Sequence, residues 1–260
     1  MDRGNGHDET IVDQFTRQAE AFAALAPHSD ADAMRLCLSA AAIEPGDRVL
    51  DVACGPGLVT CEAAKIAAHV DGLDITPAMI ELAVRRQREE GLDNIDWHSG
   101  DVRALPWNDR MFDVALCRYA FHHFQDPAAV FAEMVRVAKP DGRVVVIDVA
   151  PPPGCRERYD TFERVRDPSH ARALTPAEIA ALGHGHALTG PRIAGYGLDV
   201  ILDHQIAASH PIEGGADILR SMVRHDMETG SHSLGVSART NGKGEAVLTI
   251  PVVVAVWRKL

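Results

Sequence analysis

The chain has 260 residues, about 1.7 times a typical domain length, which favours one large domain or a domain with a small cap. Apolar residues make up 46% of the chain and charged residues 24%, as in globular proteins, so the composition excludes wholesale disorder. The formal net charge of -11 argues against nucleic acid or an anionic membrane surface as the main partner.

Cysteine usage and hydropathy indicate the compartment. The five cysteines are odd in number and show no C-x-x-C spacing, which disfavours a disulfide framework or a zinc knuckle. No apolar run reaches about 18 residues, and the polar first ten residues do not resemble a signal peptide. We therefore expect a cytoplasmic protein that does not contact a membrane.

The N-terminal part of the chain predicts two helices. Residues 1–9 are polar, and we expect them to fray. From Thr10 onward, apolar side chains recur at the spacing of an amphipathic helix; they are Ile11, Phe15, Ala19 and Phe22. A second helix is expected from about residue 30 to 42, where a Pro-Gly pair follows.

Short apolar runs then alternate with helical windows. The runs lie at 49–53, 70–75, 95–98, 112–117 and 144–149, and the helical windows lie near 59–68, 77–90 and 127–138. Strands interleaved with helices of this length predict a parallel sheet with helices on both faces.

The pattern changes after the three prolines at 151–153. An amphipathic helix is expected over 155–166, and Thr175 has the sequence context of a helix N-cap. Two β-type runs follow, at 198–207 and 246–257, with a helical stretch near 213–228 between them.

A glycine-rich loop follows the first predicted strand. The segment Asp51-Val52-Ala53-Cys54-Gly55-Pro56-Gly57 leads into a helix beginning near Val59. Glycine lets the backbone pass close to a ligand, and the helix start offers unpaired N–H groups. Asp74 ends the next strand, at the position where open α/β sheets bind the ribose hydroxyls of a nucleotide.

Two ligand classes fit such a loop. A dinucleotide-binding G-x-G-x-x-G motif would need a third glycine where Thr60 stands, and the Asp51 carboxylate would lie beside a pyrophosphate. A carboxylate there suits a ligand with a cationic amine. S-adenosylmethionine carries such an amine together with a ribose and an adenine, and it has no phosphate. It is therefore favoured over a nicotinamide dinucleotide.

Five ordered motifs resemble those of class I S-adenosylmethionine-dependent methyltransferases. They are VLDVACGPG, GLDIT followed by Pro77 and Met79, GDVRALPW, FDVALCRYAFHHF and RVVVIDV. The resemblance is greatest to the branch that contains the ubiquinone/menaquinone C-methyltransferases and many small-molecule methyltransferases. It covers residues 10–150 well and 151–260 more weakly, where VRDPSHARALT and the closing WRKL are similar to that branch.

The resemblance implies an α/β fold with a Rossmann-like, seven-stranded, mostly parallel sheet, helices on both faces, an antiparallel last strand and a helical lid. It also implies three regions. Residues 1–45 form N-terminal helices covering the cofactor site, and residues 46–150 form the S-adenosylmethionine-binding core. Residues 151–260 form lid or substrate helices and the last two strands of the same sheet.

The resemblance assigns a first set of five residues to cofactor binding, two of them at the methionine part. Asp51 and the Ala53 backbone are expected to face the amino group. Gly55 and Gly57 are expected to allow close approach of the backbone. Arg118 belongs to the same cofactor-binding set.

Five further residues are expected around the adenosine part. Asp74 would accept hydrogen bonds from both ribose hydroxyls, and Ile75 and Met79 would lie against the adenine. Asp101 would accept from the adenine amino group, and Val102 would offer its backbone N–H.

The segment after the fourth strand holds the candidate catalytic residues. Ligand crevices lie at the carboxyl ends of parallel strands, and His122 and His123 leave the strand there. Either histidine could remove a proton from a phenol or an activated carbon. The alternative for each is packing, or capping of the helix that begins near Asp126.

The acceptor pocket has four candidate residues. Phe15 and Phe22 would form an apolar wall, although aromatic residues at helical spacing are more often core. Tyr119 would lie at the carboxyl edge of the sheet. His170 in the predicted lid would reach the acceptor, or else stabilise a turn.

These observations favour methyl transfer to carbon or oxygen of a small quinone, phenol or polyketide-like acceptor. The alternative is a non-methylating enzyme, a cyclase or decarboxylase, that keeps S-adenosylmethionine as a structural or electrostatic cofactor. We expect no resident metal, because no carboxylate or cysteine completes the His184-Gly185-His186 pair at a typical spacing. A homodimer is compatible with the sequence.

Overall fold

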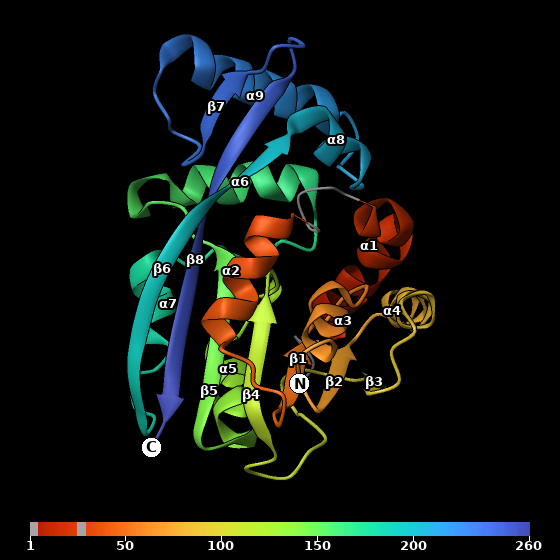
Figure 1. Ribbon diagram of the computed structural model, residues 1–260. Coiled ribbons are helices and arrows are strands. Elements are labelled where there is room, and N and C mark those ends of the chain that lie inside the picture. The colour runs from red at the N-terminus through yellow and green to blue at the C-terminus, as the bar shows by residue number, and fades with distance from the viewer. Residues whose placement is uncertain (1–4, 25–29) are drawn as a thin grey trace.

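The computed structural model describes residues 5–24 and 30–260, without the side chains of Asn5 and Phe22. Its sheet has eight strands in the spatial order β3-β2-β1-β4-β5-β8-β6, with β7 paired to β8 (Figure 1). The strands are β1 Arg48–Val52, β2 His69–Asp74, β3 Ile95–Ser99, β4 Phe112–Arg118, β5 Ala138–Val149, β6 Leu188–Ile201, β7 Ser237–Thr240 and β8 Ala246–Lys259. The predicted α/β fold is confirmed, and β7 is added to the seven strands expected.

Strands β1 to β5 are parallel to one another. The last strand, β8, lies between β5 and β6 and is antiparallel to both. The antiparallel last strand is therefore as predicted. The carboxyl ends of β1, β2 and β4 consequently meet at one edge of the sheet, because parallel strands all point the same way.

Helices pack against both faces of this sheet (Figure 1). The α-helices are α1 Asn5–Ala23, α2 Ala31–Ala41, α3 Leu58–Ala64, α4 Pro77–Glu90, α5 Pro127–Val137, α6 Arg156–Arg166, α7 Pro176–Ala181, α8 Leu202–Ala207 and α9 Gly215–Thr229, and two 3-10 turns are η2 Phe121–His123 and η3 Pro153–Cys155. Several starts are fixed by side-chain caps, including Asp30, Asp126 and the Thr175–Glu178 capping box. None of the helices in the described ranges is long and apolar enough to span a membrane.

The side chains of the strands divide the interior into two cores. Along β4, Val114 and Leu116 pack in one core, with residues of α2 and α3. Ala115 and Cys117 point to the other face and pack in the second core, with residues of α5. Because both faces of the central strands are buried, β4 is apolar at most positions rather than at alternate positions.

Two predicted boundaries were wrong. Residues 5–9 belong to α1 instead of fraying. The strand expected at 198–207 instead begins at Leu188 and ends at Ile201, and residues 202–207 form α8. Leu202 and Ile206 are both buried and lie four residues apart. This spacing is typical of a helix, and the strand prediction did not take it into account. The first half of β6 is largely exposed, so its sequence lacks the alternation of apolar residues that predicts a strand. Pairing with β8 holds this segment in the sheet.

The far ends of β6 and β8 project beyond the parallel strands, where β7, α8 and α9 join them (Figure 1). Helix α6 lies between this projection and the body of the sheet, and it packs against α9. Tyr159 and Phe162 of α6 are almost completely buried. The C-terminal part of the chain thus places α6 above the carboxyl edge of the sheet.

Candidate active site

A large cavity opens at the carboxyl ends of β1, β2 and β4. It encloses about 1130 Å³, part of which is open to solvent. Charged side chains near the strand ends line it: Asp51 as the next-to-last residue of β1, Asp74 at the end of β2, and Arg118 at the end of β4. The topology explains this gathering, because the crossover connections return every parallel strand to the same edge.

The glycine loop forms one wall of this first cavity. Gly55 adopts a φ of +52, and a Cβ built on it would meet no atom within 4 Å, so the space in front of it is open for a ligand. Ala53, another lining residue, also adopts a positive φ, of 56. A non-glycine residue in this region is strained, and such strain concentrates at functional sites.

Gly57 does not line the cavity, contrary to the prediction of close cofactor approach. Its φ is +77, and an added Cβ would lie 2.7 Å from Cη2 of Trp97 and 3.0 Å from the Cβ of Ala83. The residue lets the start of α3 pack against β3 and α4. Glycine is therefore needed at position 57 because a side chain would collide with its neighbours. At position 55 it is needed because a side chain would occupy space in the cavity.

Two buried carboxylates face the first cavity. Asp74 accepts hydrogen bonds from the backbone N–H groups of Gly55 and Thr76, at 2.9 and 2.8 Å. Burial raises its pKa, and these two hydrogen bonds oppose the rise. Asp51 accepts a hydrogen bond from Thr60 Oγ1 at 2.6 Å, and burial raises its pKa to about 7. A cationic ligand group beside Asp51 would restore the charged form.

Asp101 is held by an arginine that the sequence analysis missed. Arg103 donates to both carboxylate oxygens of Asp101, and this pairing lowers the pKa of Asp101. The guanidinium also forms an ion pair with Asp8 of α1. The Asp101 carboxylate would therefore have to share its oxygens between Arg103 and an adenine amino group. The signal in the sequence was the arginine two residues after Asp101 in GDVR.

The remaining predicted cofactor residues all line the first cavity. They are Ala53, Ile75, Met79, Val102 and Arg118. The Arg118 guanidinium carbon lies 4.3 Å from the centre of the Tyr119 ring. Helix α1 closes the outer side, because His7, Asp8, Ile11 and Phe15 also line the cavity.

A second cavity adjoins the first. It encloses about 650 Å³, part of which is open to solvent, and Phe15, Tyr119 and His123 line both cavities. Tyr119 adopts a φ of 58, a strained conformation at the point where the cavities meet. The predicted acceptor residues Phe15 and Tyr119 are thus brought together here. The side chain of Phe22 lies outside the described residues.

His122 lines the second cavity only, where it forms a dyad with Asp148. Its Nδ1 lies 2.6 Å from Asp148 Oδ1, and its backbone N–H donates to Asp148 Oδ2 at 3.0 Å. Burial alone would lower the pKa of His122, but the Asp148 carboxylate outweighs burial and raises it. With Nδ1–H donating to Asp148, Nε2 is the ring nitrogen that can accept a proton. The sequence signal for Asp148 was an acid inside the apolar run VVVIDV.

His123 lies at the junction of the two cavities in a different environment. Its Nδ1 hydrogen-bonds to the carbonyl oxygen of Ser169 at 3.0 Å, and its ring makes an edge contact with Phe15 at 5.1 Å between centroids. Burial and the neighbouring His122 lower its pKa well below the usual value. His123 is therefore neutral near neutral pH.

His170 lines neither cavity, so its position favours the second alternative, the stabilisation of a turn. It is buried, and its Nε2 lies 2.8 Å from Asp160 Oδ1. The backbone N–H groups of Ala171 and Arg172 both donate to the carbonyl oxygen of His122, at 3.0 Å. Residues 169–172 thus fasten the turn that carries the two histidines.

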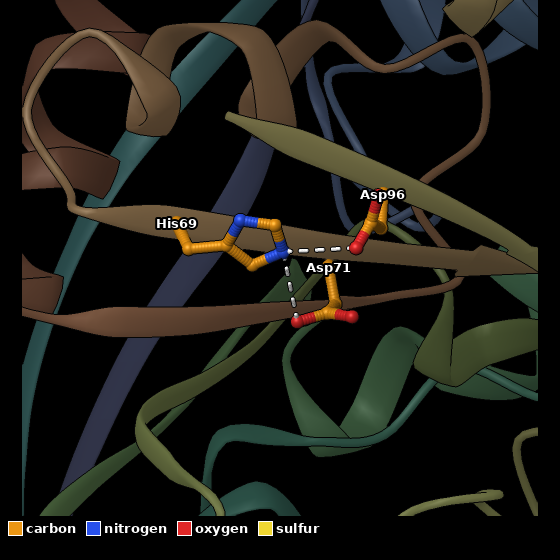
Figure 2. Close-up of side chains that lie close together, drawn as sticks. All are labelled: His69, Asp71 and Asp96. Atoms are coloured by element: carbon orange, nitrogen blue, oxygen red, sulfur yellow. Dashed lines mark ion pairs between the residues drawn. The ribbon is translucent and has the colours of Figure 1, made fainter. Parts of the chain in front are cut away.

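A cluster of potential metal ligands lies away from these cavities, toward the amino ends of β2 and β3. His69 Nε2 lies 3.6 Å from Asp71 Oδ2 and 3.3 Å from Asp96 Oδ2 (Figure 2). However, Asp71 Oδ2 already accepts a hydrogen bond from Arg48 Nε at 3.0 Å. A guanidinium on a ligand oxygen opposes a bound cation, so we assign this cluster to ion pairing.

Comparison with known proteins identifies the family. A model for a methyltransferase domain matches residues 50–146. The uncharacterized methyltransferase YcgJ of Bacillus subtilis is 30% identical over 194 residues, which cover 74% of this chain and 77% of YcgJ. A demethylmenaquinone methyltransferase of Renibacterium salmoninarum is 36% identical over 118 residues, 45% of this chain and 48% of that protein. The chain thus spans about half the length of this quinone-pathway relative.

The solved structures agree with the fold. The crystal structure of YcgJ has a TM-score of 0.78 at 25% identity, covering 88% of this chain and 98% of that one. A putative methyltransferase from Bacillus halodurans has a TM-score of 0.77 at 20% identity, covering 88% of this chain and 99% of that one.

The chain belongs to the class I S-adenosylmethionine-dependent methyltransferases. It is a methyltransferase whose cofactor is S-adenosylmethionine.

The first cavity fits this cofactor. It offers two buried carboxylates, Asp51 and Asp74, for an ammonium group and for hydroxyl donors. Ile75 and Met79 supply apolar surface for an adenine, and the space before Gly55 would be filled by any Cβ.

The two loop glycines make a matched pair of variants. Gly57→Ala should lower the free energy of unfolding by about 2–4 kcal/mol, because alanine is strained in the left-handed conformation and its Cβ would also collide with Trp97. Gly55→Ala should cost only about 1–2 kcal/mol, from strain alone, but should weaken S-adenosylhomocysteine binding at least about tenfold. Urea unfolding and calorimetry measure the two effects. Equal stability of the two variants would contradict the packing role of Gly57.

Proposed function

We propose that the chain transfers the methyl group of S-adenosylmethionine to carbon or oxygen of a small organic acceptor, of quinone, phenol or polyketide-like type, held in the second cavity. The observation that carries this proposal is the meeting of two cavities at Phe15, Tyr119 and His123. One cavity suits the cofactor, and the other presents the His122–Asp148 dyad. The similarity to demethylmenaquinone methyltransferases supports an acceptor of this type.

The cofactor roles proposed for the lining residues follow their chemistry. Asp51 pairs with the ammonium group of the methionine part, and Arg118 completes that end of the site. Asp74 accepts from the ribose hydroxyls with the lone pairs that its two backbone donors leave available. Asp101 and the Val102 N–H receive the adenine edge.

The proposal gives a different role to each of three regions of the chain. Within the region 1–45, α1 covers the cofactor, and its residues in the first cavity support this role. Residues 46–150 bind the cofactor. Residues 151–260 supply acceptor-binding helices, including α6, and strands β6 and β8 of the same sheet.

The chemistry needs alignment, exclusion of water and, for a protic acceptor, a base. When bound, the cofactor supplies a methyl group already activated by its sulfonium. Tyr119 and Phe15 shape the passage through which the acceptor atom reaches that methyl group. His122 Nε2 takes the acceptor proton, while Asp148 holds the ring through Nδ1 and stabilises the imidazolium that forms.

The reaction itself tests the proposal. We would incubate the protein and S-adenosylmethionine with phenols, hydroquinones and 1,3-diones, and measure S-adenosylhomocysteine together with methylated product by mass spectrometry. Equal amounts of both are expected for at least one acceptor class. Cofactor turnover with no methylated acceptor in any class would contradict the proposal.

Asp51 should make cofactor binding depend on pH. Its pKa is about 7, and pairing with an ammonium group requires the charged form. As the pH falls from 8 to 6, Asp51 takes up a proton, and the affinity for S-adenosylhomocysteine should fall about tenfold. Calorimetry across this range measures the effect, with Asp51→Asn as the control that should show a flat profile. Parallel profiles for the two proteins would rule out this role of Asp51.

The His122–Asp148 dyad leads to a prediction about turnover and its dependence on pH. His122→Ala should lower kcat by about 10²–10⁴-fold toward a protic acceptor, with S-adenosylhomocysteine affinity nearly unchanged. Asp148 raises the pKa of His122, so the acid limb of the activity profile should lie above the ordinary histidine value. Asp148→Asn should move that limb to lower pH, because the base then loses its proton more readily.

Melting temperatures control for misfolding, since both partners of the dyad are buried. His123→Ala provides the comparison at the neighbouring position. If His122→Ala retains turnover and His123→Ala loses it, the base is His123 and the dyad is structural.

A further inference from the structure

The polar side of the second cavity comes from helix α6. Glu163 and Arg166 lie one turn apart on this helix and both line the cavity. Arg166 donates through Nε and Nη2 to one oxygen of Glu163, Oε2, at 2.9 and 2.5 Å. Glu163 is only 3% exposed, so the pair is removed from solvent.

The other oxygen of Glu163 has no hydrogen-bond partner within residues 5–24 and 30–260. Glu163 Oε1 is buried and unpaired, and so is Oε1 of Gln205 on the same cavity. A buried carboxylate oxygen without a donor costs free energy, and that cost is removed when a donor reaches it. Both atoms are acceptors, so any group that pairs with them must be a donor.

The charges around the cavity disfavour an anion. The guanidinium of Arg166 is already paired with Glu163, and Asp167 Oδ2 lies 4.0 Å from its Nη2. Two carboxylates therefore surround the cation on this wall. The remaining walls include Val149, Leu198, Val200 and Ile250, which are apolar.

We propose that Glu163 is a specificity-determining residue for the acceptor: it receives a hydrogen bond from a hydroxyl group of a neutral, largely apolar ring compound, and Arg166 holds it in place. This inference rests on the proposed function in taking the second cavity as the acceptor site. It goes further by selecting hydroxylated neutral acceptors and excluding carboxylates and phosphates. Gln205 supplies a second acceptor for the same group or its neighbour.

Three naphthalene probes of similar shape test the proposal by equilibrium binding to the protein saturated with S-adenosylhomocysteine. They are 1-naphthol, 1-methoxynaphthalene and 1-naphthoate. The wild-type protein should bind 1-naphthol at least about tenfold more tightly than the methoxy compound, which cannot donate, and should bind 1-naphthoate most weakly.

Glu163→Gln should abolish the preference for 1-naphthol over 1-methoxynaphthalene and strengthen the binding of 1-naphthoate, because Arg166 loses its charged partner. Gain of naphthoate binding cannot result from misfolding. Glu157→Gln, at an exposed position of the same helix, should behave as the wild type.

Equal wild-type affinities for the first two probes would overturn the proposal, and so would an unchanged preference in Glu163→Gln. If that variant does not fold, the wild-type preference still decides the outcome. The binding assay is independent of turnover. Discrimination among the probes without any methylated product would contradict the proposed function and leave the role of Glu163 intact, whereas product formation without discrimination would do the opposite.

Discussion

Burial of charged side chains at the carboxyl edge of the sheet is the constraint on which the site depends. Asp51, Asp74, Arg118 and Asp148 each lie at or near the end of a buried strand, and none is more than 8% exposed. Taking such a charge out of water costs several kcal/mol unless it is paired and hydrogen-bonded. Backbone N–H groups satisfy Asp74, and His122 satisfies Asp148. The strand ends are therefore held in the positions that a charged or polar ligand requires.

The same constraint reaches the segment that follows β4. Tyr119 is strained, and η2 immediately after it carries both histidines. Strain of this kind persists only where the surroundings over-determine it. Here the surroundings are the backbone donors of residues 171–172, which bind the carbonyl oxygen of His122, and Ser169, whose carbonyl oxygen binds His123. Residues 169–172 thus support the turn that carries the two histidines.

The two cavities differ in the chemistry of the side chains that line them. The first brings the carboxylates of Asp51, Asp74 and Asp101 to one cavity, where they can orient the cationic end of a ligand. The second combines apolar side chains of β6 and β8 with directional polar groups of α6 and η2. Helix α1 contributes Phe15 to both, which couples coverage of the cofactor to the shape of the acceptor chamber.

The sequence by itself determined the α/β class, the strand and helix order through residue 150, and the acids at the strand ends. These features are local, because hydrophobic period, capping and glycine turns are written within a few residues. Only the tertiary structure decided which side chains meet. The His122–Asp148 dyad joins residues 26 apart, and the packing role of Gly57 depends on a tryptophan from another strand. Likewise, the exposed half of β6 has no burial pattern of its own and is ordered by β8. Such contacts depend on how distant segments pack, and no local period in the chain records that packing.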